Sequence, residues 1–170
     1  MVTTSSNAAD NVLQKISPQP APPAMARPWL QLNAPMTDWH GRRVWLVGAS
    51  TGIGLACAQA LRAAGAQVVI SARNPQGVLD WAKQDAGVQW HALDVGDHAE
   101  VQATARAILA QGPLDLVVYA AGYYRAQRAT AMNMEDLLQH DKINYQGALQ
   151  VIDAVLPALL ARQSGHISLL

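Results

Sequence analysis

The chain has 170 residues, 51% of them hydrophobic, and its 12 basic and 12 acidic residues give a formal net charge of zero. This length is enough for one domain with a real core, and the balanced charge argues against nucleic acid as a partner. Asp153 and Pro157 interrupt the best apolar run, so no membrane span is expected. The N-terminus lacks a hydrophobic signal core, so we expect a cytoplasmic protein.

Residues 1–38 differ in composition from the rest of the chain. Six of the nine prolines lie here, among Ser, Thr, Asn, Gln and Ala. A segment such as PQPAPPAMARP can form neither a helix nor a central strand, so it should be extended and mobile. We therefore predict a Pro-rich flexible N-terminal segment over 1–38, and a folded domain over 39–170.

The first predicted unit of the domain is a strand, a glycine-rich turn and a helix. The strand covers 43–47, the turn has the sequence VGASTGIG, and the helix covers 52–64. Glycine tolerates positive φ and lets the backbone approach a ligand closely. A helix N-terminus offers free N–H groups and partial positive charge, which suit a pyrophosphate. The unit is typical of dinucleotide-binding folds, whereas the missing Gly-Lys-Ser/Thr ending excludes a P-loop.

The remaining chain alternates in the same way. Further strands are predicted at 67–72, 88–93, 114–120 and 166–170. Between them, Asn74-Pro75 predicts the start of a helix to Ala86, Asp97 and Glu100 predict a capped helix to Gln111, and a long helix covers 134–162. The expected fold is α/β, a Rossmann-type doubly wound parallel sheet that stops after its fifth strand.

Helical spacing predicts which face of each helix is apolar. On the first helix the predicted inward face consists of Ile53, Ala56, Cys57, Ala60, Leu61 and Ala64. The lone cysteine, Cys57, is interpreted as a small core residue. On the long helix, we expect a face with Val151, Val155 and Leu159 to be exposed, because the part of the fold that would cover it is missing.

The spacing Gly-x-x-x-Gly-x-Gly resembles that of the short-chain dehydrogenase/reductase family. This chain has Val47 where the family usually has Thr, which removes one side-chain hydrogen bond from the turn. The resemblance covers 39–170, the family's cofactor-binding half. It implies that the turn binds a nicotinamide dinucleotide through Gly48, Ser50, Thr51, Gly52, Ile53 and Gly54.

The end of the second strand bears on the choice between NADP and NAD. An acidic residue at this point would bind the ribose hydroxyls of NAD, and an arginine would pair with a 2′-phosphate. Here Ala72 takes the acidic position and Arg73 follows, so NADP is favoured over NAD. After the third strand come Asp94 and Val95, the pair that contacts adenine in the resembled family.

Two further motifs are compared with the family pattern. Tyr119-Ala120-Ala121-Gly122 stands where the family usually has Asn-Asn-Ala-Gly, so Ala120, Ala121 and Gly122 are predicted to let the backbone pass close to the cofactor. The lost asparagine removes a local hydrogen-bond network. Asn144 matches the family's helix asparagine, which holds a water of the proton relay, and is the one predicted catalytic residue.

The rest of the family's catalytic set is absent from this chain. No tyrosine is followed four residues later by a lysine, and the family's serine would come after Leu170. The resemblance implies hydride transfer between nicotinamide and a small carbonyl or alcohol substrate, in a protein that is a homo-oligomer at full length. We expect the 170-residue chain, as a fragment, to be inactive.

Other interpretations of the sequence stay open. One is a non-catalytic nucleotide-binding or interaction protein complete at Leu170, and a weaker one is another glycine-turn fold such as a methyltransferase. His91 and His166 lie on predicted strands, and no residue cluster has metal-ligand spacing, so no metal site is predicted. Tyr123, Tyr124, Arg125 and Arg128 lie at the edge where ligands bind, and they either face substrate or cap a loop.

Overall fold

A computed structural model describes residues 36–75 and 77–170 of the chain. The flexibility predicted for 1–38 therefore falls almost wholly outside the described residues. The elements in chain order are β1 Arg43–Val47, α1 Gly52–Ala63, β2 Gln67–Ala72, α2 Val78–Gln84, β3 Val88–Ala92, α3 His98–Ala110, β4 Leu116–Tyr119, α4 Met134–Asp141, a π turn Lys142–Gln146, α5 Gly147–Arg162 and β5 His166–Leu169. Within these described ranges, no helix is both long and apolar enough to cross a membrane.

The five strands form one parallel sheet in the order β3-β2-β1-β4-β5. The central strand β1 pairs with β2 and β4, and its last residue, Val47, lies opposite Ser71 on one side and Tyr119 on the other. The carboxyl ends of these three strands therefore meet at one edge of the sheet. This topology confirms the predicted Rossmann-type fold.

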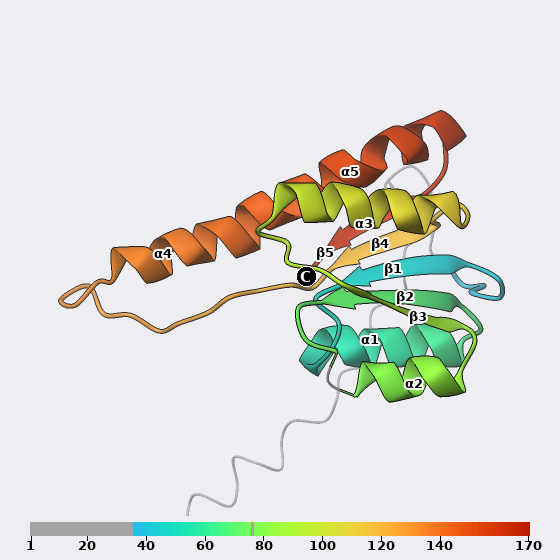
Figure 1. The fold of residues 1–170 in the computed structure, drawn as a ribbon, viewed down its shortest axis with the longest axis horizontal. Coiled ribbons are helices and arrows are strands. Elements are labelled where there is room, and N and C mark those ends of the chain that lie inside the picture. Colours follow the sequence, from blue (N-terminus) through green and yellow to red (C-terminus); the bar gives the residue numbers. More distant parts are fainter. Residues whose placement is uncertain (1–35, 76) are drawn as a thin grey trace, which may run out of the picture. The chain divides into compact units, whose positions relative to one another are not determined.

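Helices cover both faces of the sheet, with α1 and α2 on one face and α3 and α5 on the other (Figure 1). All five residues of β1 are buried because side chains pointing to either face meet a helix layer. Val44 and Leu46 belong to the core beneath α1 and α2. Trp45 and Val47 belong to the core beneath α3 and α5. The Trp45 indole N–H donates to Ser71 Oγ at 2.9 Å, so this buried polar group has its partner.

The predicted inward face of α1 is partly wrong. Ile53 is 75% exposed, and Ala56, Ala60 and Ala64 are exposed as well. The helix buries Gly54 and Ala58 instead, with Leu55, Cys57 and Leu61 packed at the margin of that core. The reason is steric: a Cβ at Gly54 would lie 2.8 Å from the Gly48 carbonyl oxygen, so glycine at this position lets the helix approach the turn closely.

The second helix starts later than the sequence predicts. Asn74 and Pro75 are not its cap and first residue, since α2 begins at Val78. Gly77 stands at the N-cap position with φ of 74°, a left-handed conformation that favours glycine. The Pro75 carbonyl accepts the Val78 N–H at 2.8 Å, so Pro75 belongs to a turn that precedes the helix.

The predicted long helix is interrupted. Its first part, α4, is capped by Asn133, whose side chain accepts the N–H of Glu135 at 2.9 Å. A π turn follows, and only then does α5 begin. The expectation that Val151, Val155 and Leu159 are exposed is wrong, because all three pack against α3 and the sheet and are buried. The predicted cap at Asp97 is confirmed, since its carboxylate accepts the Glu100 N–H at 3.1 Å.

Candidate functional site

The glycine-rich turn between β1 and α1 lies at the carboxyl edge of the sheet. Gly48 and Gly52 both have positive φ, 82° and 58°, so the turn depends on glycine at two positions. The Gly48 N–H donates to the Ser71 carbonyl at 2.6 Å, which joins the start of the turn to β2. A Cβ on Gly48 would overlap the backbone of Ala121, so this glycine lets the turn pack against the segment after β4.

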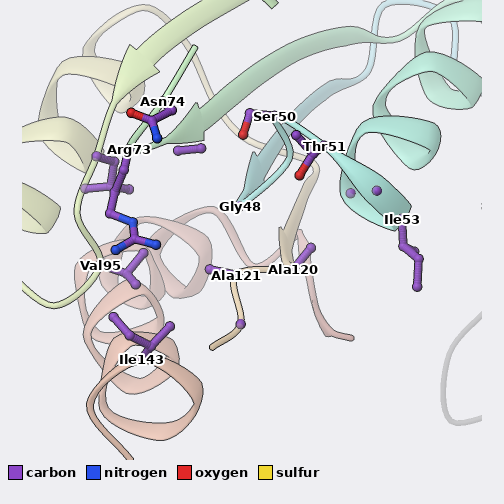
Figure 2. Close-up of a pocket in the computed structure, with 15 residues that line it drawn as sticks. Gly48, Ser50, Thr51, Ile53, Arg73, Asn74, Val95, Ala120, Ala121 and Ile143 are labelled. Atoms are coloured by element: carbon purple, nitrogen blue, oxygen red, sulfur yellow. The ribbon is translucent and has the colours of Figure 1, made fainter. Parts of the chain in front are cut away.

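A cavity of about 500 Å³ opens at this edge (Figure 2). Of the thirteen residues predicted to bind the cofactor or catalyse, eleven line it: Gly48, Ser50, Thr51, Gly52, Ile53, Gly54, Arg73, Val95, Ala120, Ala121 and Gly122. The other four lining residues, which the sequence did not predict to bind the cofactor, are Ala72, Asn74, Leu93 and Ile143. Each neighbours a predicted residue in the chain, so the rule that ligands bind at the carboxyl ends of strands would have found them.

The charges around the cavity suit an anionic ligand. Arg73 is the only charged side chain among the residues that line it, and it is exposed. The first turn of α1 has no acidic residue, and Thr51 at its N-cap makes no capping hydrogen bond with its side chain. The amide groups at this helix end are therefore not taken by a side-chain cap and can receive a phosphate. The residues present thus fit a dinucleotide.

The exposed side chain of Ile53 has a place at this site. It was predicted both as part of the inward face of α1 and as a cofactor-binding residue, and the structure places it on the cavity wall (Figure 2). Its 75% exposure excludes the first of these two roles. An apolar side chain exposed at the mouth of a cavity loses contact with water when a ligand covers it, which favours binding.

Asp94 does not line the cavity, although Leu93 and Val95 on either side of it do. Its carboxylate accepts the Gly96 N–H at 2.8 Å, which closes the turn after β3. The adenine contact of Asp94 stays a prediction, and Val95 offers the cavity an apolar wall. The adenine contact of Val95 stays a prediction.

Tyr119 ends β4 where the resembled pattern has asparagine. Its side chain is 3% exposed, and its hydroxyl donates to the Ile143 carbonyl at 2.5 Å. Burial raises the pKa of Tyr119 to about 12, and the negative charge of Asp94 adds to this. The hydroxyl therefore stays protonated at neutral pH and can act as a donor.

Asn144 does not line the cavity, and its side chain is fully engaged with Tyr123. Its Oδ1 accepts the Tyr123 N–H at 2.7 Å, and its Nδ2 donates to the Tyr123 carbonyl at 2.9 Å. The amide side chain thus fixes the segment that follows β4, next to the cavity wall formed by Gly122. Its predicted catalytic role, through a bound water, stays a prediction.

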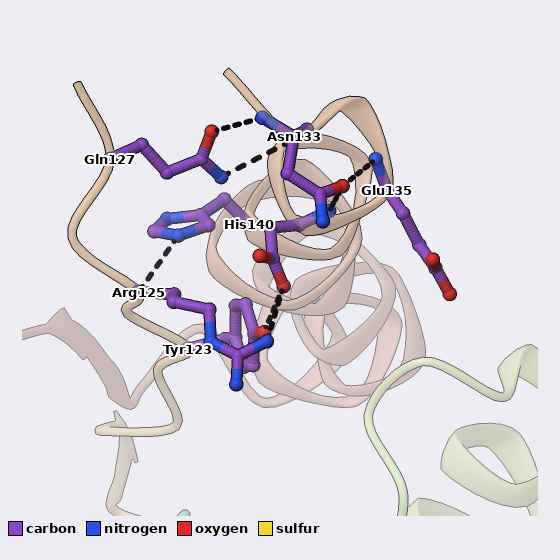
Figure 3. A network of polar contacts seen from close by, with 7 residues as sticks. Tyr123, Arg125, Gln127, Asn133, Glu135 and His140 are labelled. Carbon is purple, nitrogen blue, oxygen red and sulfur yellow. Dashed lines mark hydrogen bonds and ion pairs between the residues drawn. The ribbon is translucent and has the colours of Figure 1, made fainter. Parts of the chain in front are cut away.

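The segment after β4 is held against α4 by a polar network (Figure 3). The Tyr123 hydroxyl donates to Asp136 at 2.7 Å, and the Arg125 guanidinium lies 3.3 Å from the same carboxylate oxygen. The hydrogen bond from Tyr123 and the charge of Arg125 lower the pKa of Asp136. The Arg125 N–H donates to His140 Nε2 at 3.0 Å, and the Tyr123 ring packs edge-on against the His140 ring.

The network assigns roles that the sequence left open. The side chains of Tyr123 and Arg125 join the segment after β4 to Asp136 of α4. Tyr124, between them, is 84% exposed. Arg128 forms an isolated β-bridge with Ala131 in the same segment. In the described ranges no group of His, Cys, Asp and Glu side chains could hold a metal ion. Burial lowers the pKa of His91, on β3, as expected for a histidine kept neutral inside a fold.

The parallel sheet, the glycine turn and the cavity at the carboxyl edge define the class of Rossmann-type dinucleotide-binding domains. Within that class, the chain belongs to the short-chain dehydrogenase family, whose model matches residues 42–168.

Curated relatives agree with this assignment. An uncharacterised oxidoreductase of Staphylococcus haemolyticus is 34% identical over 135 residues, which cover 78% of this chain and 58% of the relative. L-xylulose reductase of Homo sapiens is 34% identical over 122 residues, which cover 72% of this chain and 49% of that enzyme. The chain thus spans about half the length of the curated relatives it matches.

Solved structures show the same fold. A gluconate 5-dehydrogenase from Burkholderia cenocepacia J2315, in complex with NADP and tartrate, has a TM-score of 0.70 and 32% sequence identity, and the match covers 78% of this chain and 55% of that one. A short-chain dehydrogenase from Streptomyces avermitilis has a TM-score of 0.72 and 27% identity, with 76% of this chain and 48% of the other covered. The similarity again spans about half of each neighbour.

Proposed function

We propose that this chain is the cofactor-binding part of an NAD(P)-dependent oxidoreductase that transfers a hydride between nicotinamide and a carbonyl or alcohol carbon. The observation that carries this proposal is the cavity at the glycine turn, where an uncapped helix N-terminus and a single cation converge. The bound dinucleotide would supply the hydride chemistry. The residues of this chain would hold its phosphates and exclude water from one side of it.

We infer further that the cofactor is NADP rather than NAD. Arg73 and Asn74 follow β2 and line the cavity, and no acidic side chain lines it. A carboxylate would be needed to receive the ribose hydroxyls of NAD, whereas a guanidinium matches a 2′-phosphate in charge and geometry. The relative solved with NADP supports the same preference, since it is 32% identical to this chain.

An Arg73→Ala variant tests the cofactor preference. Loss of one charge-assisted hydrogen bond costs roughly 1.5–3 kcal/mol, so NADPH affinity should fall about 10- to 100-fold while NADH affinity changes little. Calorimetric titration with both cofactors measures this. The matched control is Arg106→Ala, which removes an exposed arginine of α3 that does not line the cavity. Equal losses for the two cofactors, or a wild type that prefers NADH, would refute the role of Arg73.

The chain alone is proposed to bind cofactor without turning over substrate. Its four tyrosines and three lysines provide no Tyr-x-x-x-Lys pair, and Tyr119 and Tyr123 are engaged with Ile143 and Asp136. The alternative, a non-catalytic nucleotide-binding or interaction protein, makes the same prediction for the chain alone. NADPH oxidation with a panel of ketones and aldehydes tests it, since turnover would mean that a tyrosine of this chain donates the proton.

For the whole protein we propose a homo-oligomer that acts in the cytoplasm on a small carbonyl or alcohol substrate, without nucleic-acid or membrane partners. The support for an oligomer is an apolar stripe on the outer side of the π turn and α5, made of Tyr145, Leu149, Leu156 and Leu160. These side chains are 39–65% exposed and recur at helical spacing. The formal charge of zero supports the absence of nucleic acid.

A further inference from the structure

The π turn between α4 and α5 changes the partner of one carbonyl. In a regular α-helix the Gly147 N–H would donate to the Ile143 carbonyl, four residues before it. Here it donates to the Lys142 carbonyl, five residues before it. The Ile143 carbonyl therefore loses its α-helical donor, and it does so in a residue that is only 6% exposed. A buried carbonyl in this position needs another donor.

Tyr119 provides that donor from the end of β4. Its hydroxyl lies 2.5 Å from the Ile143 carbonyl oxygen. The hydroxyl fits because position 147 is glycine: a Cβ there would lie 2.5 Å from the Tyr119 oxygen and 3.0 Å from a methyl group of Val95. The Tyr119 hydroxyl, the π turn and Gly147 thus form one packed unit.

The π turn connects this unit to the cavity. Ile143 lines the cavity, as does Val95, and Figure 2 shows both side chains on its wall below Arg73. The next residue, Asn144, holds Tyr123 through two hydrogen bonds. If the turn relaxed to regular α-helical spacing, residues on its N-terminal side would rotate relative to α5, and both contacts would move.

We propose that Tyr119 is a positioning residue whose hydroxyl holds the π turn in the register that presents Ile143 to the cavity and Asn144 to Tyr123. Tyr119 stands where the family pattern has asparagine, and it makes its hydrogen bond through a hydroxyl group instead of an amide. The inference rests on the proposed function in one respect: the wall formed by Ile143 and Val95 would meet the adenosine part of the dinucleotide.

The test is a Tyr119→Phe variant of the whole chain, followed by NMR-detected hydrogen exchange. The Tyr123 amide should exchange about tenfold faster, as expected when the hydrogen bond that orders its acceptor is lost. Sheet amides such as that of Val117 should keep their wild-type rates. The dissociation constant for adenosine 2′,5′-bisphosphate should also rise about tenfold. A matched control, Tyr145→Phe, removes a hydroxyl from a 61% exposed side chain of the same turn and should change neither quantity.

Two results would overturn the inference. An unchanged exchange rate at Tyr123 in a folded Tyr119→Phe variant would show that the hydroxyl does not hold the turn. An equal increase at Tyr123 and Val117 would show general destabilisation instead of positioning. If the variant does not fold, the exchange rate of the Tyr119 hydroxyl proton in the wild-type protein tests the contact instead. This proton should be visible by NMR as a slowly exchanging resonance, and rapid exchange would refute the hydrogen bond.

The two proposals fail in distinguishable ways. If wild-type protein does not bind adenosine 2′,5′-bisphosphate, the proposed preference for NADP is contradicted, while the exchange rate of the Tyr123 amide still tests the role of Tyr119. If the wild type binds this probe and Tyr119→Phe binds it equally well with unchanged exchange, the role of Tyr119 is refuted and the proposed function stands.

Discussion

Gly48 and Gly52 both adopt positive φ in the turn between β1 and α1, but their surroundings differ. A Cβ at Gly48 would overlap the backbone of Ala121, which belongs to the segment after β4. Apart from the adjacent residues and the backbone of α1 itself, no described atom lies within 4 Å of a Cβ placed at Gly52. Glycine at position 48 is therefore needed both for its positive φ and for the close packing against Ala121. Glycine at position 52 is needed for its positive φ, and it leaves room for a ligand to approach the backbone.

This contrast predicts different costs for the same substitution. Gly48→Ala should lower the free energy of unfolding by roughly 3 kcal/mol or more, because backbone must move to admit the methyl group and φ is strained. Gly52→Ala should cost about 1–2 kcal/mol, from the left-handed conformation alone. Urea denaturation followed by circular dichroism measures both values. Equal costs would contradict the close approach of the turn to Ala121.

At the scale of residues, the sequence predicts positions better than partners. Glycine spacing located the turn because only glycine meets its steric demands, and the neighbouring residues line the cavity as a consequence. The hydrogen-bond partners of Asp94 and Asn144 were not predictable. Asp94 accepts a backbone N–H two residues away, and Asn144 accepts one that is 21 residues away. Such choices depend on the local path of the loops, which hydrophobic periodicity does not encode.

At the scale of elements, Asp115 joins three parts of the fold. It precedes β4 and is 8% exposed. Its carboxylate accepts the backbone N–H of Arg43, which begins β1, at 2.9 Å, and the guanidinium of Arg162, at the end of α5, at 2.9 Å. Arg42 adds a third contact at 3.2 Å. Burial alone would raise the pKa of Asp115, but these donors together hold it below its ordinary value.

A lowered pKa in the folded state makes stability depend on pH. The Asp115 contribution is present above the unfolded-state pKa of about 4 and is lost as the pH falls through the lower folded-state value. Asp115→Asn should therefore lower the free energy of unfolding by about 1–3 kcal/mol at pH 7 and by progressively less below about pH 4. The control is Asp80→Asn in the exposed ion pair with Lys83, where a much smaller change is expected.

Denaturation of the two variants and the wild type at several pH values measures this difference. An Asp115→Asn variant whose deficit stays constant from pH 7 to strongly acidic pH would contradict the assignment, because the deficit would then not come from the charged carboxylate.

Element boundaries were predictable where caps are local and unpredictable where tertiary packing sets them. Asp97 caps α3 as its sequence predicts. The π turn could not be predicted, because it depends on a donor from β4, 24 residues away. The start of α2 was misplaced because Pro75 suits both the first turn of a helix and a preceding turn, and the left-handed Gly77 decides between them.

At the scale of the whole molecule, the parallel sheet with helices on both faces followed from the alternation of elements and the handedness of their connections. The exposed surface did not. One face of α5 packs against α3 and the sheet, which buries Val151, Val155 and Leu159. Another face of the same helix is exposed and carries Leu149, Leu156 and Leu160. Helical periodicity shows that a helix has apolar sides, but not which side meets the core when both are apolar.

The fold places β1 at the centre of the sheet, and the turn that leaves its carboxyl end gives the cavity its helix N-terminus and its close backbone contacts. Arg73, which follows the neighbouring strand β2, is the cation among the residues that line the cavity. The most direct test is calorimetric titration of the folded 170-residue chain with NADPH. We expect one NADPH to bind per chain, and more tightly than NADH. A chain that is folded by circular dichroism and releases or absorbs no heat with either cofactor would contradict the proposal that this domain binds a nicotinamide dinucleotide.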